Sequence, residues 1–259
     1  MEKTVRLHSI QTFGTMDGPG IRTVLFFQGC PFRCAYCHNP DAWSFHDGND
    51  MSLSSLFAMM EEYRSYYGKD GGVTVSGGEC LFQADFLVDF LKECKKKGIH
   101  TVVDTSGMTR PGTNEKAIFP TTFSDAGTHV ESCKKRLVFQ EADLVLLDLK
   151  FTTEEKYHAY TAGSLAEVLE TLSLLQQIKK PVWIRQVIIP GINDSLDEMI
   201  QLKKILMPFP CIEKVDLLPF RKLCLEKYKQ QNLEFPFRDI PEMSSGELVR
   251  LQEFYDTLL

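Results

Sequence analysis

The chain has 259 residues, of which 43% are hydrophobic and 25% are charged, and its formal net charge at pH 7 is −6. This composition is typical of a globular protein, and the length suits one large α/β domain. The acidic balance argues against a nucleic-acid-binding protein, because such proteins neutralise phosphates with basic side chains.

The N-terminal sequence MEKTVRLHSIQTF lacks the apolar core of a signal peptide. No apolar run approaches the roughly 18 residues that a membrane span needs. We therefore expect a cytoplasmic protein with no membrane partner. In that compartment thiols stay reduced, so the eight cysteines are candidates for ligands or buried apolar residues rather than disulfides.

Short β-rich runs alternate along the chain with helical patterns. Their Val, Ile and Leu content is typical of parallel strands that are buried on both faces. In chain order the predicted strands are Arg22–Phe27, Gly72–Val75, Thr101–Asp104, Leu144–Asp148, Val182–Ile189 and Lys214–Leu218. The predicted helices are Ser52–Tyr67, Ala84–Lys97, Ser164–Lys179, Asp194–Leu206 and Ser244–Leu258.

Six strand–helix units in series predict a parallel sheet with right-handed crossovers. Because there are six units and not eight, we expect an α/β fold of the partial (β/α)6 barrel type, with parallel strands and one open side. The whole chain, 1–259, is predicted to be a single domain. Residues 108–141 have weak periodicity and are predicted to form a long irregular insertion.

Polar residues collect where the predicted strands end. In parallel α/β folds the ligand binds at the carboxyl ends of the strands. These ends carry the cysteine-rich segment after Gly29, the run Ser76-Gly77-Gly78-Glu79, Asp104-Thr105-Ser106, Asp148-Leu149-Lys150, and Arg221 after the last strand, while Arg185 interrupts an otherwise apolar run. We interpret this edge of the sheet as an active site.

Three cysteines, Cys30, Cys34 and Cys37, lie within eight residues in the motif CxxxCxxC. Structural zinc prefers four ligands in two close pairs, and no second pair follows. A CxxC redox motif would leave Cys30 unexplained. A [4Fe–4S] cluster held by three thiolates would keep one iron open for a substrate or cofactor, which explains the missing fourth thiol.

The motif and its surroundings resemble the radical S-adenosylmethionine superfamily, and within it the glycyl-radical activating branch, whose members include the pyruvate formate-lyase activating enzymes. The matching segments are Gly14–Asp41 with DGPGIR and YCHNPD, Gly71–Glu79, Gly98–Gly107, Asp143–Lys150, Val182–Gly191 and Val215–Phe220. They extend over nearly the whole chain.

The resemblance implies a role for each matching residue. Cys30, Cys34 and Cys37 correspond to the iron ligands of a [4Fe–4S] cluster, whose fourth iron binds S-adenosylmethionine. The implied cofactor contacts are Tyr36, Cys37, His38, Gly77, Gly78, Glu79, Asp104, Asp148, Leu149 and Lys150. Glycines let the backbone approach a ligand closely, and the carboxylate of Glu79 is an acceptor for an amino group.

Three further assignments follow from the same resemblance. Asp104, Thr105 and Asp148 resemble the oxygen ligands of a monovalent cation, which would offset repulsion between carboxylates. Asp17 corresponds to a residue that meets an arginine on a loop of the partner protein. Arg221 stands where the family commonly has a histidine, and it is interpreted either as a cofactor-facing cation or as a solvated arginine.

The implied reaction is reductive cleavage of S-adenosylmethionine to methionine and a 5′-deoxyadenosyl radical, which abstracts hydrogen from a glycine of pyruvate formate-lyase. A flavodoxin or ferredoxin is the implied electron donor. The alternatives are an activase of a different glycyl-radical enzyme and a non-catalytic iron–sulfur or zinc module. Residues 38–79 contain no cysteine, so they cannot hold the second cluster that several other activases carry there.

Overall fold

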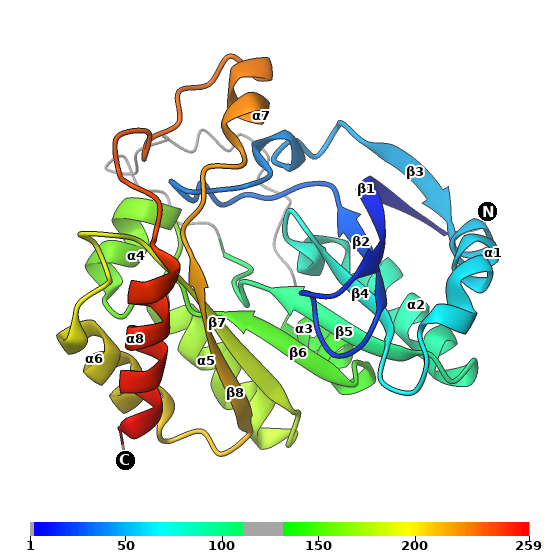
Figure 1. Ribbon diagram of the computed structural model, residues 1–259. Helices are drawn as coiled ribbons and strands as arrows, with labels where there is room; N and C mark the ends of the chain where they lie inside the picture. The colour runs from blue at the N-terminus through cyan, green and yellow to red at the C-terminus, as the bar shows by residue number, and fades with distance from the viewer. Residues whose placement is uncertain (1–2, 111–131, 259) are drawn as a thin grey trace. The chain divides into compact units, whose positions relative to one another are not determined.

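The computed structural model describes residues 3–110 and 132–258. Contacts within the chain group these residues into two compact units. The first contains 3–31, 41–105 and 132–146, and the second contains 32–40, 106–110 and 147–258. The described strands form an open sheet in the order β3-β1-β2-β4-β5-β6-β7-β8 (Figure 1).

The first unit is built on parallel strands that are buried on both faces. β2 (Arg22–Phe27) pairs in parallel with β4 (Gly72–Gly77), and β4 pairs in parallel with β5 (His100–Thr105). Apolar residues of these strands are inaccessible to solvent, which is why they read as continuous hydrophobic runs. They are Val24, Leu25, Phe27, Val73, Val75, Val102 and Val103.

Two antiparallel strands extend the sheet on the side of β2. β1 (Thr4–Gly14) pairs with β2 and with β3 (Asn49–Ser52). In β1 the buried Val5 and Leu7 alternate with more exposed polar residues, as in a strand with one solvated face. Neither strand was predicted, because neither is a continuous apolar run of the kind that buried parallel strands form.

Of the three α-helices described in the first unit, α1 and α2 were predicted and α3 was not. α1 (Leu53–Tyr63) begins after Ser52, whose side chain accepts the Ser55 N–H, and the short helix η2 (Arg64–Tyr66) continues it. α2 (Ala84–Lys96) buries its apolar face and packs against α3 (Ser132–Glu141). Two further short helices are η1 (Pro40–Ala42) and η3 (Cys80–Gln83).

The second unit contains β7 (Val182–Ile188), which pairs in parallel with β8 (Ile212–Pro219). β6 (Leu144–Asp148) contributes Leu147 and Asp148 to this unit. Its helices are α4 (Glu154–Thr161), α5 (Leu165–Gln177), α6 (Leu196–Leu206), α7 (Leu225–Gln230) and α8 (Ser245–Thr257). Side chains of Thr153, Ser164, Ser195 and Ser244 cap four of them.

The α/β class and the open side of the sheet are confirmed, and all six predicted strands and five predicted helices are present. The sheet is larger than predicted, since two antiparallel strands add to the six. The single-domain assignment stays a prediction. Of the predicted irregular insertion 108–141, residues 132–141 form α3, and residues 111–131 lie outside the described residues.

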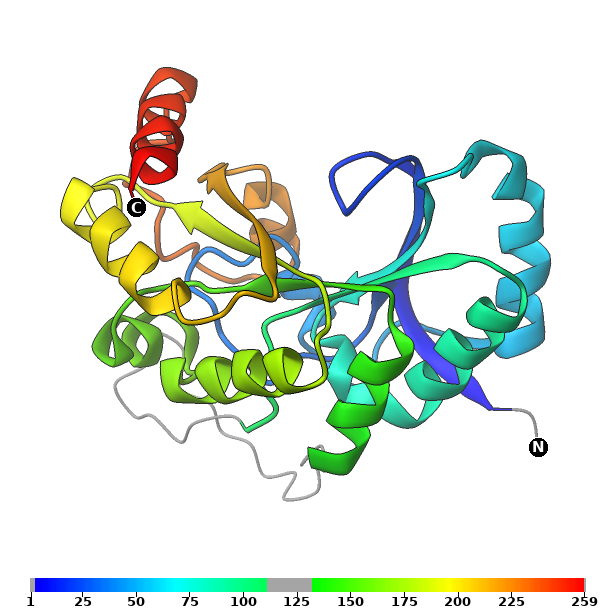
Figure 2. The same cartoon turned by 90° about the horizontal axis from the view of Figure 1, so that it is seen from below.

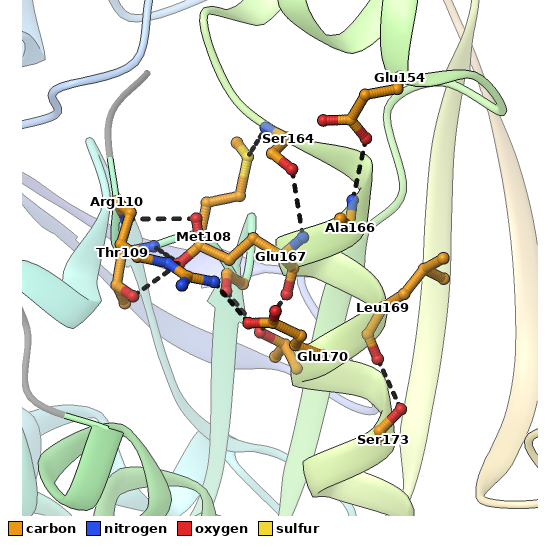
Figure 3. A network of polar contacts seen from close by, with 12 residues as sticks. Met108, Thr109, Arg110, Glu154, Ser164, Ala166, Glu167, Leu169, Glu170 and Ser173 are labelled. Carbon is orange, nitrogen blue, oxygen red and sulfur yellow. Dashed lines mark hydrogen bonds and ion pairs between the residues drawn. The ribbon is translucent and has the colours of Figure 1, made fainter. Parts of the chain in front are cut away.

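Residues 107–110, where the predicted insertion begins, are hydrogen-bonded to α5 in the second unit (Figure 3). The buried carboxylate of Glu167 accepts the N–H and the hydroxyl of Thr109, both at 2.7 Å, and the N–H of Arg110 at 3.3 Å. The Arg110 guanidinium pairs with Glu170 on the next turn. The Thr171 hydroxyl donates to the Gly107 carbonyl at 2.6 Å. Residues 107–110 are therefore held firmly on one helix.

Candidate active site

The cysteine motif begins in the first unit and ends in the second. The N–H groups of Gly29 and Cys30 donate to the carbonyls of Ala42 and Trp43 at 2.9 and 3.2 Å. Gly29 has φ +100°, and a Cβ there would lie 2.4 Å from the Phe45 ring. Glycine is therefore required directly before Cys30.

Cys34 and Cys37 belong to the second unit, where backbone hydrogen bonds fix the segment between and around them. The N–H groups of Arg33 and Ala35 donate to the last turn of α4, at 3.0 and 2.8 Å. The Cys37 N–H donates to the Cys34 carbonyl at 3.0 Å, and the Cys37 sulfur accepts the Asn39 N–H at 3.4 Å. A sulfur that accepts a backbone N–H is typical of thiolate ligands.

The chemistry of these thiols fits an iron–sulfur cluster. All eight cysteines are thiols rather than disulfides. Burial raises the pKa of the Cys34 thiol, although the charge of Lys150 acts in the opposite direction. A thiolate at this position needs a neighbouring positive charge, which an iron centre supplies. Among the described residues no three His, Cys, Asp or Glu side chains form a closed metal-binding group, so the ligand set stays a prediction.

A glycine pair ends β4 at a place where no side chain fits. The Gly78 N–H donates to the Phe27 carbonyl at 2.8 Å, and the Glu79 N–H donates to the Gly29 carbonyl at 2.9 Å. A Cβ on Gly77 or Gly78 would lie 2.1 or 2.4 Å from the backbone of Phe27 or Gly29. The absence of side chains at this pair lets the end of β4 lie close to the end of β2, while its approach to a cofactor stays a prediction.

In the first unit, hydroxyl groups orient two of the predicted carboxylates, those of Glu79 and Asp104. The Thr105 hydroxyl donates to Glu79 Oε1 at 2.5 Å, and the same oxygen accepts the Leu81 N–H. The Ser76 hydroxyl donates to Asp104 Oδ2 at 2.6 Å. Glu79 is buried, so these donors orient a carboxylate that is otherwise costly to place there.

In the second unit Asp148 is held between two cations. Its carboxylate accepts from Lys150 Nζ at 3.0 Å and from Arg185 Nε and Nη2 at 3.1 and 3.0 Å. Burial works against the charged carboxylate, but the charges of Lys150 and Arg185 outweigh it and lower the pKa of Asp148. Burial likewise works against the charged ammonium, but Asp148 outweighs it and raises the pKa of Lys150 well above its usual value.

The backbone around this ion group is fixed too. The Leu149 N–H donates to the Arg185 carbonyl at 3.0 Å, and the Lys150 N–H donates to the Tyr157 hydroxyl at 2.8 Å. Sequence reasoning noticed Arg185 as a charge in an apolar strand but gave it no role, and it did not consider Tyr157. An arginine in an apolar strand was the signal that could have identified Arg185, whereas the sequence held no such signal for Tyr157.

Tyr36 lies in an aromatic cluster within the second unit. Its ring packs against Phe151 and Phe237, with centroids 6.0 and 6.2 Å apart, and Lys150 Nζ lies 5.9 Å from its centroid. Among the described residues its buried hydroxyl has no hydrogen-bond partner. Tyr36, Asp148 and Lys150 are therefore brought together, while their contacts with a cofactor stay a prediction.

His38 and Arg221 also meet, but through the backbone of Arg221. His38 Nε2 lies 2.9 Å from the Arg221 carbonyl oxygen. The guanidinium of Arg221 donates to the Met243 carbonyl and lies 4.0 Å from Glu242. Its predicted contact with a cofactor stays a prediction, since the guanidinium has partners of its own in the second unit.

Asp17, the predicted partner-contact residue, lies in the connection between β1 and β2. The Thr74 hydroxyl donates to the Asp17 carbonyl at 2.6 Å and accepts from Arg22 Nε at 2.7 Å. The fully buried guanidinium of Arg22 also donates to the carbonyls of Pro19 and Val73. Burial lowers the pKa of Arg22 to about 10. Its hydrogen bonds to backbone carbonyls hold the connection between β1 and β2 in place.

Comparisons with known proteins show the family to which the chain belongs. Residues 16–166 match the model of a 4Fe-4S single cluster domain. The chain is 38% identical over 255 residues to the pyruvate formate-lyase-activating enzyme of Clostridium pasteurianum, covering 98% of both chains. The chain belongs to the pyruvate formate-lyase-activating enzyme family.

Solved structures with lower identity share the fold. A radical SAM methyltransferase from Sphaerobacter thermophilus is similar with a TM-score of 0.58 at 14% identity, covering 91% of this chain and 63% of that one. SuiB from Streptococcus suis, bound to S-adenosylmethionine, has a TM-score of 0.62 at 12% identity, covering 90% and 48%. As a member of the activating enzyme family, the chain is a radical SAM enzyme with a single 4Fe-4S cluster domain.

Proposed function

We propose that this protein activates pyruvate formate-lyase by generating a glycyl radical in it, through reductive cleavage of S-adenosylmethionine. The observation that carries the proposal is similarity to curated activating enzymes over nearly the whole chain, with CxxxCxxC, Gly-Gly-Glu and DGPGIR all present. One electron, one S-adenosylmethionine and one glycine C–H give methionine, 5′-deoxyadenosine and the glycyl radical.

Cys30, Cys34 and Cys37 would hold the cluster. When bound, such a cluster supplies the electron that cleaves S-adenosylmethionine and offers an open iron to its amino and carboxylate groups. The glycine pair Gly77-Gly78 keeps the end of β4 free of side chains, and Glu79 supplies a carboxylate already oriented by Thr105. Both features suit an ammonium-bearing ligand.

Lys150 and Asp148 would serve the remainder of the cofactor. Their mutual pairing, with Arg185 as a second cation, gives a group of fixed charges that needs no rearrangement when a polar ligand binds. Tyr36 lies beneath Lys150 in an apolar cluster, which would exclude water from this side. His38 and Leu149 would complete the cofactor contacts in the second unit. The His38 ring lies within hydrogen-bond distance of the Arg221 carbonyl, and the Leu149 N–H donates to the Arg185 carbonyl.

A monovalent cation is a finer part of the proposal. Asp104, Thr105 and Asp148 offer oxygen ligands, and a hard cation would offset the charge of two carboxylates. Activity should then depend on whether the buffer contains potassium, sodium or only a bulky organic cation. Equal rates in all three would contradict a cation site.

The reaction needs a one-electron reductant, for which we propose a flavodoxin or ferredoxin in the cytoplasm. Among the described residues no helix is long and apolar enough to span a membrane. The cysteine-free stretch between Cys37 and Cys80 favours the lyase activase over those activases that hold a second cluster there. An activase of a different glycyl-radical enzyme remains the second candidate.

The test is anaerobic. The reconstituted protein, a reductant, S-adenosylmethionine and pyruvate formate-lyase are mixed, and the paramagnetic resonance spectrum is recorded together with 5′-deoxyadenosine. We expect a glycyl-radical signal on the lyase and a matching amount of 5′-deoxyadenosine. If 5′-deoxyadenosine forms while the lyase stays silent, the enzyme class stands and the assignment of this lyase fails.

A further inference from the structure

A short helix, α7, lies beside the end of the cysteine motif in the second unit. Figure 2 shows α7, in orange, next to the blue segment that contains residues 32–40, and Figure 1 shows the two side by side from another direction. Lys227 Nζ on α7 donates to Asn39 Oδ1 at 2.8 Å. His38 Nε2 lies 2.9 Å from the carbonyl oxygen of Arg221, which precedes the helix. The helix is therefore packed against the residues that directly follow Cys37.

One aromatic residue of α7 holds the helix in this place. Because α7 has only six residues, its own hydrogen bonds stabilise it little. Tyr228 is 1% exposed, and its ring meets the Phe235 ring edge to face, with centroids 5.0 Å apart. Burial raises the pKa of the Tyr228 hydroxyl, and the charge of Cys37 acts in the same direction. Tyr228 thus fixes the helix, and with it the adjacent Lys227, beside a predicted iron ligand.

Lys227 is linked to Cys37 through a single residue. The side chain of Asn39 accepts from Lys227, and its backbone N–H donates to the Cys37 sulfur at 3.4 Å. The first contact holds a full positive charge beside the motif, and the second directs a partly positive N–H group at the sulfur. Hydrogen bonds to ligand sulfurs and the local charge are two of the features that set the reduction potential of iron–sulfur clusters.

We propose that Lys227, acting through Asn39, is a positioning residue that makes the cluster easier to reduce. This rests on the proposed function, in which Cys30, Cys34 and Cys37 hold a [4Fe–4S] cluster. Reduction transfers one electron from the one-electron donor to the cluster, so the cluster becomes more negative while no bond forms or breaks. The ammonium group and the N–H donor stabilise this added negative charge and so favour the reduced form.

The same helix carries a second lysine that allows a matched comparison. The Lys229 side chain is 81% exposed and lies 4.0 Å from Glu226. Solvent screens a charge at such a position, so it acts weakly on a distant group. Lys227 is instead partly buried and hydrogen-bonded to the residue that contacts Cys37. Neutralising either lysine changes the net charge equally, so only their different positions relative to the motif can separate their effects.

The experiment compares Lys227→Gln with Lys229→Gln, the matched control, and with Lys227→Arg, which keeps the charge. Each full-length protein is reconstituted anaerobically, and paramagnetic resonance follows the reduced cluster during a reductive titration without S-adenosylmethionine. We expect Lys227→Gln to lower the equilibrium constant for reduction about tenfold, which makes the midpoint potential about 59 mV more negative. Lys229→Gln and Lys227→Arg should each stay within about threefold of the wild-type constant.

A fourth variant, Asn39→Leu, tests the link itself. It removes the acceptor for Lys227 but keeps the backbone N–H, so we expect a shift in the same direction as in Lys227→Gln. Iron and sulfide are measured in every variant, and Asn39→Leu decides the question if Lys227→Gln does not retain the cluster. An unchanged potential in the deciding variant, or an equal shift in Lys229→Gln, would overturn the role of Lys227. A wild-type protein that binds no cluster would instead overturn the cluster site of the proposed function.

Discussion

The partly buried carboxylate of Asp148 is stabilised by neighbouring cations, whose own burial would be unfavourable without the carboxylate. Asp148 lies between Lys150 and Arg185, and each cation lowers the cost of burying the carboxylate. Breaking such a group leaves an uncompensated charge, which costs more than the group contributes when intact. The carboxylate should therefore depend on both cations.

We predict that Arg185→Met lowers the free energy of unfolding by about 1–3 kcal/mol at pH 7, because Asp148 loses two hydrogen bonds and a charge. The pKa of Asp148 is lowered in the fold, so its contribution is present above the carboxyl's ordinary pKa and is lost as pH falls through the folded value. In Arg185→Met that loss should begin at higher pH. Anaerobic urea unfolding between pH 4 and 7 measures both effects, and Arg185→Lys should show a smaller change.

A second residue-scale prediction concerns the thiols. Changing Cys30, Cys34 or Cys37 singly to Ser should remove most of the iron and sulfide from anaerobically reconstituted protein, since a three-thiolate site has no spare ligand. Cys133→Ser, at an exposed cysteine on α3, is the control and should keep the full content. Iron and sulfide analysis measures the outcome. Stoichiometric zinc without sulfide would contradict the cluster.

At the scale of elements, α5 has two functions: it packs in the core and it anchors the chain after β5. Glu167 accepts from three donors of Thr109 and Arg110, while Glu170 pairs with the exposed Arg110 guanidinium (Figure 3). The two glutamates are one turn apart, so they form a natural pair for comparison.

We predict that Glu167→Gln lowers the free energy of unfolding by about 1–3 kcal/mol, because the amide cannot accept from all three buried donors. Glu170→Gln should change it by less than about 0.5 kcal/mol, as is usual for an exposed ion pair. Denaturant unfolding of both variants gives the comparison. Equal effects would mean that residues 107–110 do not depend on the buried carboxylate.

The helices and strands that could be predicted are those whose local residue pattern determines their conformation. The buried parallel strands are continuous apolar runs, and α2 combines a helical apolar face with a terminal Gly98. β1 was not predicted because its apolar residues alternate with polar ones and its pairing depends on β2 and β3. α7 has only six residues, so tertiary contacts decide it rather than periodicity.

The candidate site divides in a similar way. The resemblance implied Glu79, Asp104 and Thr105 as site residues, and in the structure the Thr105 hydroxyl donates to Glu79 while the Ser76 hydroxyl donates to Asp104. Spacing could not predict that Arg22 of DGPGIR is a buried support for the Asp17 connection, because its acceptors are backbone carbonyls on other segments. Which hydroxyl orients which carboxylate is likewise a property of the fold.

On the scale of the whole molecule, activating another protein requires two separable abilities: cleaving the cofactor and engaging the substrate. Residues expected to contact the cofactor lie at or after the ends of β2, β4, β5, β6 and β8, whereas Asp17 lies in the connection between β1 and β2. The backbone of that connection is held by Thr74 and Arg22, so a side-chain change at Asp17 leaves its path intact.

We predict that Asp17→Asn reduces glycyl-radical formation on the lyase at least tenfold at subsaturating lyase, because a charge-assisted hydrogen bond to a cationic side chain is lost. Formation of 5′-deoxyadenosine without the lyase should fall far less. Asp47→Asn removes the same charge at an exposed position outside the connection and serves as the control. Spin quantitation and chromatography measure the two products in parallel. If Asp17→Asn reduces both products equally, Asp17 acts on cofactor cleavage and not on the substrate.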